Sequence, residues 1–150
     1  MTSDTPSSPA AAEAPRGLLL FAHGARDPLW ARPFQAVAAH CRQARGEAPG
    51  LPEADSRVAL AFLEFMQPTL VDAGARLAGA GCTQVDIVPL FLGAGGHVRK
   101  DLPALVAQLE AAHPGVQWHL RRAVGEAEAV VQAMAGVALG AADLPLVTLR

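Results

Sequence analysis

Three ionisable side chains follow short apolar runs, at points where buried strands would end. His23 follows the run GLLLFA, Glu64 ends the run RVALAFLE, and His97 comes a few residues after QVDIVPLFL. A neutral imidazole can accept a proton near neutral pH, and two imidazoles with a carboxylate can bind a divalent first-row metal ion such as Co²⁺, Ni²⁺ or Fe²⁺. The three residues are therefore candidates for proton transfer, for metal binding, or for both.

Each of these residues has a simpler interpretation when it is taken alone. A histidine at a strand end is often a hydrogen-bonded structural residue, and Glu64 could be a solvated strand end. The glycines of LGAGGHVRKD match neither GxGxxG nor GxxxxGK[ST], so binding of a nucleotide phosphate is weakly supported. The joint occurrence of the three residues favours a role in proton transfer or metal binding, because three ionisable residues rarely fall by accident at the carboxyl ends of three adjacent strands.

Short apolar runs alternate with longer segments of helical period along the chain. The predicted strands cover residues 17–22, 57–64, 84–92 and 116–124, and the predicted helices cover 28–45, 68–79, a segment around 105–109, and 126–139. Asp27 and Pro28 are typical of a helix start, with Asp as the N-cap and Pro as the first helical residue. Residues 93–101, which include His97, are expected to form a loop.

This alternation predicts an α/β fold with a parallel sheet, because parallel strands are connected by crossover helices. We expect one flavodoxin-like domain over residues 17–140, with strand order 2-1-3-4 and helices on both faces of the sheet. Glu64, His23 and His97 would then line one edge of the sheet in that order, the outer pair on the order of 10 Å apart. Phe65 and Phe91 are close enough to this predicted crevice to border a ligand.

Charge and cysteine content exclude several classes of protein. The net charge is −2 and the basic residues form no stripe, which argues against a nucleic-acid partner. Cys41 and Cys82 are the only cysteines and their spacing fits no metal motif, so a reducing cytoplasm is the expected location. No apolar run is long enough to span a membrane.

The two ends of the chain differ in composition from its middle. Residues 1–16 are rich in Pro, Ser and Ala and are predicted to be a disordered leader. Residues 141–150 form a C-terminal tail without a clear assignment, either an added edge strand or an arm exchanged with a partner.

Three segments in this order resemble a known family. HGARDP after the first strand, AFLE closing the second, and VPLFLGAGGHVRKDLP after the third are similar to the small CbiX/SirB-type sirohydrochlorin chelatases, which are class II chelatases. The resemblance covers about residues 18–124. It implies a lyase that inserts Co²⁺ or Fe²⁺ into the tetrapyrrole sirohydrochlorin for cobalamin or sirohaem synthesis, without ATP and without a permanently bound cofactor.

The resemblance also assigns roles to residues. His23 resembles the proton-accepting and metal-binding histidine of the family, and His97 its second metal-binding histidine. Glu64 resembles a catalytic and substrate-contacting position. Because the substrate carries many carboxylates, nearby cations are expected to bind it as well. The expected substrate-binding residues are Glu64, Leu92, Gly93, Ala94, Gly95, Gly96, Arg26, Arg99 and Lys100.

Longer members of this family have two similar lobes, whereas this chain has one, so the resemblance implies a homodimer. One departure is Ala25, where the family often has a serine that could hydrogen-bond near the histidine. Two alternatives remain open. A carrier of metal or tetrapyrrole would use the same histidines for binding alone. A histidine-dependent phosphatase would need an arginine before the histidine, where this chain has Ala22.

Overall fold

The computed structural model describes residues 15–93 and 95–149, and the side chain of His97 is not part of this description. The predicted leader, residues 1–16, therefore lies outside the described residues except for Pro15 and Arg16, and Arg16 already begins the first strand.

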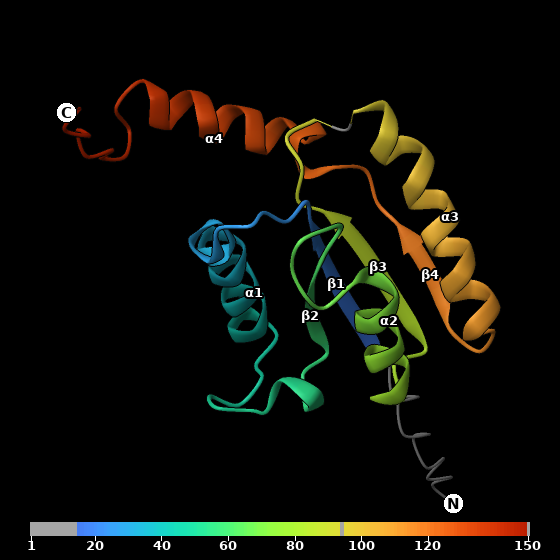
Figure 1. The fold of residues 1–150 in the computed structure, drawn as a ribbon. Coiled ribbons are helices and arrows are strands. Elements are labelled where there is room, and N and C mark those ends of the chain that lie inside the picture. The colour runs from blue at the N-terminus through green and yellow to red at the C-terminus, as the bar shows by residue number, and fades with distance from the viewer. Residues whose placement is uncertain (1–14, 94, 150) are drawn as a thin grey trace, which may run out of the picture.

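A parallel sheet of four strands forms the centre of the fold (Figure 1). Its strands are β1 (Arg16–Ala22), β2 (Val58–Phe62), β3 (Gln84–Pro89) and β4 (Gln117–Leu120). They lie in the order β2-β1-β3-β4, which confirms the predicted order 2-1-3-4. In this register Ala22 pairs with Phe62 and Phe21 pairs with Pro89, so the carboxyl ends of three strands meet at one edge.

Helices cover both faces of the sheet, as the sequence predicts. They are α1 (Arg32–Ala44), α2 (Leu70–Gly79), α3 (Gly96–Ala112) and α4 (Glu128–Ala138), with short 3₁₀ turns η1 (Pro28–Ala31), η2 (Glu53–Asp55) and η3 (Val124–Glu126). Alternate residues of β1 divide between two buried clusters, because successive side chains of a strand point to opposite faces. Leu19 packs with residues of α2 and α3, whereas Leu20 packs with residues of α1.

Two helix starts follow the expected capping chemistry. The Asp27 side chain accepts a hydrogen bond from the Leu29 N–H, which fixes η1 before α1 begins. The hydroxyl of Thr69 accepts one from the Asp72 N–H at the start of α2.

The start of α3 differs from the prediction. We expected residues 93–101 to be a loop, but α3 begins at Gly96, so His97, Arg99 and Lys100 lie in its first turns. The glycines hid this start, because glycine weakens any helical pattern, and Pro103 lies inside the helix rather than ending it. Among the helices of residues 15–93 and 95–149, none has the length and apolar character needed to cross a membrane.

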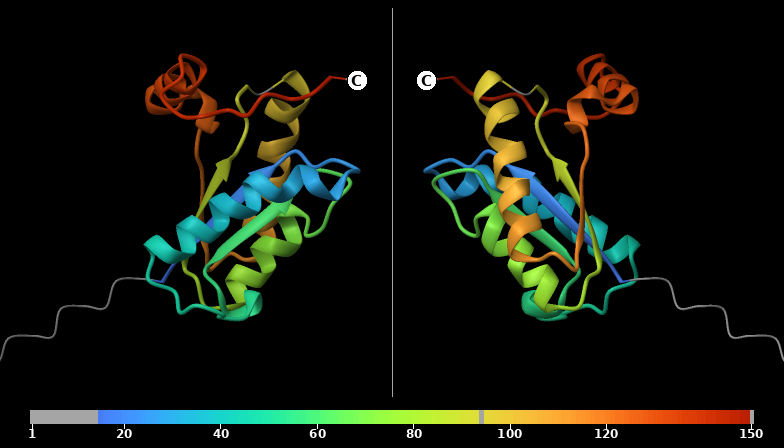
Figure 2. Two further views of the ribbon diagram at one scale, coloured as in Figure 1. Left: turned by 90° about the vertical axis from the view of Figure 1, so that its left-hand side faces the viewer. Right: turned by 90° about the vertical axis from the view of Figure 1, so that its right-hand side faces the viewer.

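The last helix stands apart from the rest of the fold. Figures 1 and 2 show α4 beyond the carboxyl ends of the strands, separate from the sheet and from α1. None of its residues is buried, and Val131 and Met134 are 48% and 51% exposed. Leu139, directly after the helix, is 89% exposed. Residues 141–149 follow it without helix or strand.

Candidate active site

His23 lies directly after β1, at the carboxyl edge of the sheet, where its side chain is 49% exposed. The next residue, Gly24, has a φ of +93°, which turns the chain sharply away from the strand. A Cβ atom at Gly24 would overlap the backbone carbonyl of Glu64. The turn after β1 therefore packs directly on the turn after β2.

Glu64 lies two residues beyond the end of β2 and turns toward His23. Glu64 Oε1 is 3.0 Å from His23 Nε2, although the residues are 41 positions apart in sequence. Pairing of the backbone continues past the strands, since the Leu63 N–H donates to the Ala22 carbonyl and the Glu64 N–H donates to the His23 carbonyl. The prediction placed Glu64 at the end of the strand, whereas it occupies the following turn.

The contact between His23 and Glu64 sets the tautomer of the imidazole. An ionised carboxylate can only accept hydrogen bonds, so Nε2 of His23 carries the proton while Glu64 is ionised. This leaves the lone pair of His23 Nδ1 available to accept a proton or to bind a metal ion. A carboxylate that holds a histidine in this way is common beside metal ions in proteins.

Phe91 forms an aromatic wall beside the imidazole. Its ring centroid lies 6.3 Å from that of His23, with the ring planes at 67°, and it packs edge-on against Phe21 at 5.8 Å. Only 8% of Phe91 is exposed. The buried core therefore continues up to the base of the site.

The predicted substrate-binding segment lies next to this wall. Leu92 is 64% exposed, and Gly93, Gly95 and Gly96 are exposed as well. Ala94 lies outside the described residues, as does the side chain of His97, so the expected meeting of His97 with His23 stays a prediction. Among the described residues no group of three His, Cys, Asp or Glu side chains is close enough to bind a metal ion.

The three predicted cations occupy two places at the edge of the sheet. Arg26 follows His23 by three residues, and its guanidinium lies 5.1 Å from the centroid of the Phe65 ring. Arg99 lines a groove of about 380 Å³ between the start of α3 and the ends of β3 and β4, and Lys100 is exposed on α3.

The groove contains two further arginines that sequence reasoning missed. Arg121 and Arg122 line it together with Arg99, and Phe91 forms part of its wall. Arg121 pairs with Asp86 at 2.9 Å, and Arg122 lies 3.8 Å from Glu126. The sequence predicted both arginines inside the fourth strand, but β4 ends at Leu120, and the position of α3 makes them part of one groove.

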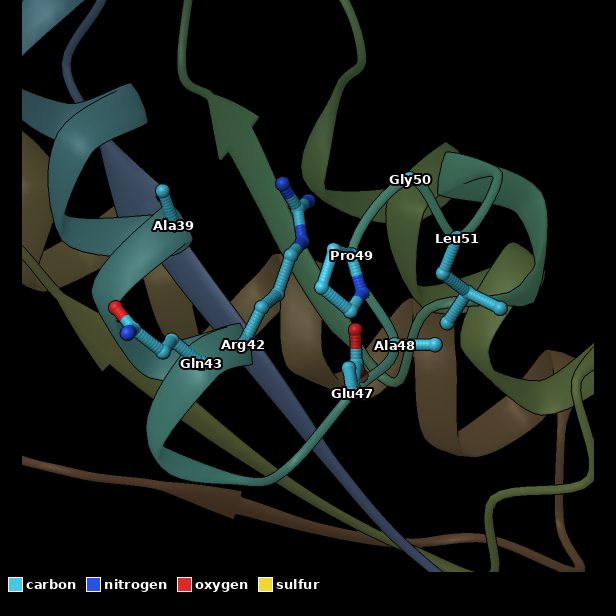
Figure 3. Close-up of a pocket in the computed structure, with 8 residues that line it drawn as sticks. All are labelled: Ala39, Arg42, Gln43, Glu47, Ala48, Pro49, Gly50 and Leu51. Atoms are coloured by element: carbon cyan, nitrogen blue, oxygen red, sulfur yellow. The ribbon is translucent and has the colours of Figure 1, made fainter.

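A separate pocket of about 390 Å³ lies near the amino end of β2, where the Arg42 side chain donates to the carbonyl of Val58 (Figure 3). It is lined mainly by the end of α1 and the following loop. Its charged groups hold the fold together, because the Arg42 Nε donates to Ser56 at 3.2 Å and Ser56 donates to Glu47 at 2.7 Å. No residue of the predicted site lines this pocket.

Comparison with known proteins identifies relatives of the chain. The family model CbiX matches residues 17–138. The chain is 32% identical over 91 residues to a sirohydrochlorin cobaltochelatase of Methanosarcina acetivorans, and 33% identical over 90 residues to one of Saccharolobus solfataricus. These matches cover 61% and 60% of this chain and 64% and 62% of the relatives, so the matched part spans less than two thirds of their length.

Solved structures show the same architecture. A putative cobalamin biosynthesis CbiX protein from Marinobacter aquaeolei has a TM-score of 0.68 at 33% identity, and the match covers 83% of this chain and 95% of that one. The sirohydrochlorin chelatase SirB from Bacillus subtilis subspecies spizizenii, in complex with cobalt, has a TM-score of 0.61 at 25% identity. The match covers 79% of this chain and 47% of SirB, which is about half of the longer protein.

Proposed function

The chain belongs to the CbiX family, and we propose on that premise that it is a chelatase that inserts Co²⁺ or Fe²⁺ into sirohydrochlorin without ATP. The relatives named as sirohydrochlorin cobaltochelatases support the reaction and the metal. A single observation carries the proposal. His23 Nε2 lies 3.0 Å from Glu64 Oε1, and both side chains are about half exposed at the carboxyl edge of the sheet.

Metal insertion requires the removal of protons. Two pyrrole N–H groups of the macrocycle must lose their protons as a divalent metal ion enters, so the site needs a base. His23 supplies one at Nδ1, because its Nε2 proton is directed at Glu64. When Nδ1 accepts a proton, the ring becomes an imidazolium, and the adjacent carboxylate of Glu64 stabilises its charge.

The metal ion is the second substrate, and it needs ligands that release it readily. Imidazole nitrogen is a suitable ligand for Co²⁺, Ni²⁺ and Fe²⁺. Nδ1 of His23 cannot hold a metal ion and a proton at the same time. With a second histidine, one imidazole could bind the metal ion while the other accepts the proton. We propose His97 for this, because α3 begins at the same edge of the sheet and His97 is its second residue.

The substrate carries carboxylates at its periphery. Because the net charge of the protein is −2, binding these carboxylates requires positively charged side chains near the site. Arg26 and Lys100 are exposed at the edge of the sheet, and Arg99 lines the groove with Arg121 and Arg122. Leu92, Gly93, Ala94, Gly95 and Gly96 are proposed to contact the macrocycle between these two groups. Exposed N–H groups of such a glycine-rich segment can also hydrogen-bond carboxylates.

We propose that the active form is a homodimer. The SirB chain is about twice as long as the part that this chain matches, so a second copy would supply a comparable second lobe. The exposed Val131 and Met134 of α4 and Leu139 directly after it support a partner, because an isolated helix rarely leaves such an apolar face in solvent. Two free cysteines fit a reducing cytoplasm as the location.

The experiment that tests the function is an anaerobic absorbance assay of metal insertion. Sirohydrochlorin in excess over protein is mixed with Co²⁺, Ni²⁺ or Fe²⁺, and the conversion is followed with and without the protein. Multiple turnovers above the uncatalysed rate with Co²⁺ or Fe²⁺ support a chelatase. Saturation at one metal ion or one macrocycle per site would contradict catalysis and show a carrier instead.

A further inference from the structure

Phe65 adopts a backbone conformation that is unfavourable for its residue type. Its φ is +63°, and among the described residues it is the one non-glycine residue with a positive φ. A bulky side chain in the left-handed region is strained, and such strain persists only where the surroundings enforce it. Phe65 is therefore held in this conformation by its neighbours rather than by its own preference.

The neighbours of Phe65 are fixed on both sides. The Glu64 N–H donates to the His23 carbonyl at 3.1 Å, and the Met66 N–H donates to the Glu64 carbonyl at 2.8 Å. Met66 itself packs against the apolar cluster under α1. The loop closes where the Phe62 N–H donates to the Pro68 carbonyl at 2.9 Å.

The strain is not compensated by burial of the ring. The side chain of Phe65 is 58% exposed, whereas an aromatic ring usually contributes to stability by leaving water. One face of the ring carries the guanidinium of Arg26, 5.1 Å from its centroid. Both side chains line a depression of about 310 Å³ beside the turn that contains Glu64.

An exposed aromatic ring next to a cation suits one class of ligand. Aromatic faces stack on flat conjugated ring systems, and a guanidinium pairs with carboxylates at the periphery of such a system. Phe65 directly follows Glu64, whose carboxylate contacts His23. A flat molecule stacked on Phe65 would therefore lie next to the turn that holds Glu64.

We propose that Phe65 and Arg26 form a stacking platform that binds the conjugated, polyanionic macrocycle and places it against His23 and Glu64. This inference rests on the proposed function for the identity of the macrocycle. Phe65 supplies the flat contact and Arg26 supplies the charge. The left-handed backbone at Phe65 is the means by which the ring is directed into solvent instead of into the core.

The test compares binding of metal-free sirohydrochlorin, followed by quenching of its fluorescence, with thermal unfolding of the same variants. Phe65→Trp is expected to bind like the wild type, and Phe65→Ala to bind about tenfold more weakly. Phe65→Gly is expected to bind as weakly as Phe65→Ala but to unfold at a higher temperature than Phe65→Ala, because glycine accepts a positive φ without strain. Leu51→Ala, at an exposed leucine in the pocket near the amino end of β2, is the matched control.

Salt separates the two parts of the platform. Arg26→Ala is expected to weaken binding at low ionic strength and to differ less from the wild type at 0.5 M salt, whereas the loss in Phe65→Gly should persist. Binding of Phe65→Ala and Phe65→Gly within twofold of the wild type would overturn the platform. A different outcome is that binding depends on Phe65 but the wild type inserts no metal. That result would contradict the proposed reaction and support the platform.

Discussion

Glu64 is joined to His23 through both backbone and side chain. Its N–H donates to the His23 carbonyl at 3.1 Å, while its Oε1 lies 3.0 Å from the His23 Nε2. The two residues come from turns after neighbouring parallel strands, so the sheet itself sets their separation. The proposed base and the carboxylate that contacts it are thus held at the hydrogen-bonded ends of two adjacent strands.

Replacement of His23 should remove the base. We expect His23→Ala to lower the rate of metal insertion by about 10²-fold or more, the usual contribution of a positioned general base. The measurement is the anaerobic absorbance assay with Co²⁺. His40→Ala removes an exposed histidine of α1 and is the matched control.

His97→Ala should also lower the rate of metal insertion in the same assay. Full activity in both His23→Ala and His97→Ala would remove these histidines from the mechanism.

Replacement of Glu64 should disturb the orientation of the base without removing it. We expect Glu64→Gln to lower kcat about 10- to 100-fold, because the amide can hydrogen-bond Nε2 but cannot stabilise the imidazolium charge. Steady-state rates over a range of sirohydrochlorin concentrations separate kcat from KM. An unchanged kcat with a raised KM would show that Glu64 contacts the substrate only and does not support His23.

Gly24 should tolerate no side chain. A Cβ atom there would overlap the Glu64 carbonyl, and φ is +93°. We expect Gly24→Ala to lower the free energy of unfolding by about 1–3 kcal/mol and to lower activity, since Glu64 must shift.

Gly46→Ala is the control for Gly24→Ala. Gly46 also has a positive φ, of 75°, but nothing lies within 4 Å of the added atom. We expect Gly46→Ala to lower the free energy of unfolding by about 1–2 kcal/mol, from backbone strain alone, and to leave activity unchanged. Urea unfolding together with the insertion assay measures both effects, and equal losses of activity in the two variants would contradict the close approach of the turns.

Charge placed on the exposed face of α4 should break the proposed dimer. We expect the double variant Val131→Glu, Met134→Glu to sediment as a monomer at micromolar concentration, whereas the wild type sediments as a dimer, because burial of two carboxylates in an apolar contact is costly. Gln132→Glu, at an exposed position of the same helix, is the control for added charge. A wild type that is monomeric at all concentrations would contradict the dimer.

The two cysteines should differ in reactivity. Burial raises the pKa of the Cys82 thiol, and the thiolate is the form that alkylates, so Cys82 should react with iodoacetamide much more slowly than the half-buried Cys41 at neutral pH. Mass spectrometry of the peptides measures both rates, with denatured protein as the control in which both react. Because the pKa is raised on folding, Cys82 should also lower the stability of the fold as the pH rises above the pKa of the unfolded thiol.

The sequence predicted the sheet and the meeting of His23 with Glu64 at its edge for a simple physical reason. Buried parallel strands are continuous apolar runs, and both His23 and Glu64 follow such runs closely. The start of α3 could not be predicted in the same way, because two glycines before His97 obscure the helical pattern. The conformation of Phe65 was also hidden, since nothing in its residue type favours a positive φ.

Tertiary contacts account for the remaining differences. Arg121 and Arg122 share a groove with Arg99 only because α3 packs beside the end of β4. The isolation of α4 was equally unpredictable, since its alanine and valine content is typical of a helix that packs on its own sheet. Composition indicates that a helix has an apolar face, but it does not indicate which molecule that face contacts.

The backbone of Gly125 lies against that of Leu92, because its N–H donates to the Phe91 carbonyl at 2.9 Å and a side chain at Gly125 would overlap Leu92. Gly125 is part of η3, and α4 starts three residues after it. The turn before α4 is thereby packed against Leu92, at the start of the glycine-rich segment that precedes His97. We expect the proposed dimer contact of α4 and the proposed substrate site to be linked through this contact, so that each alters the affinity of the other.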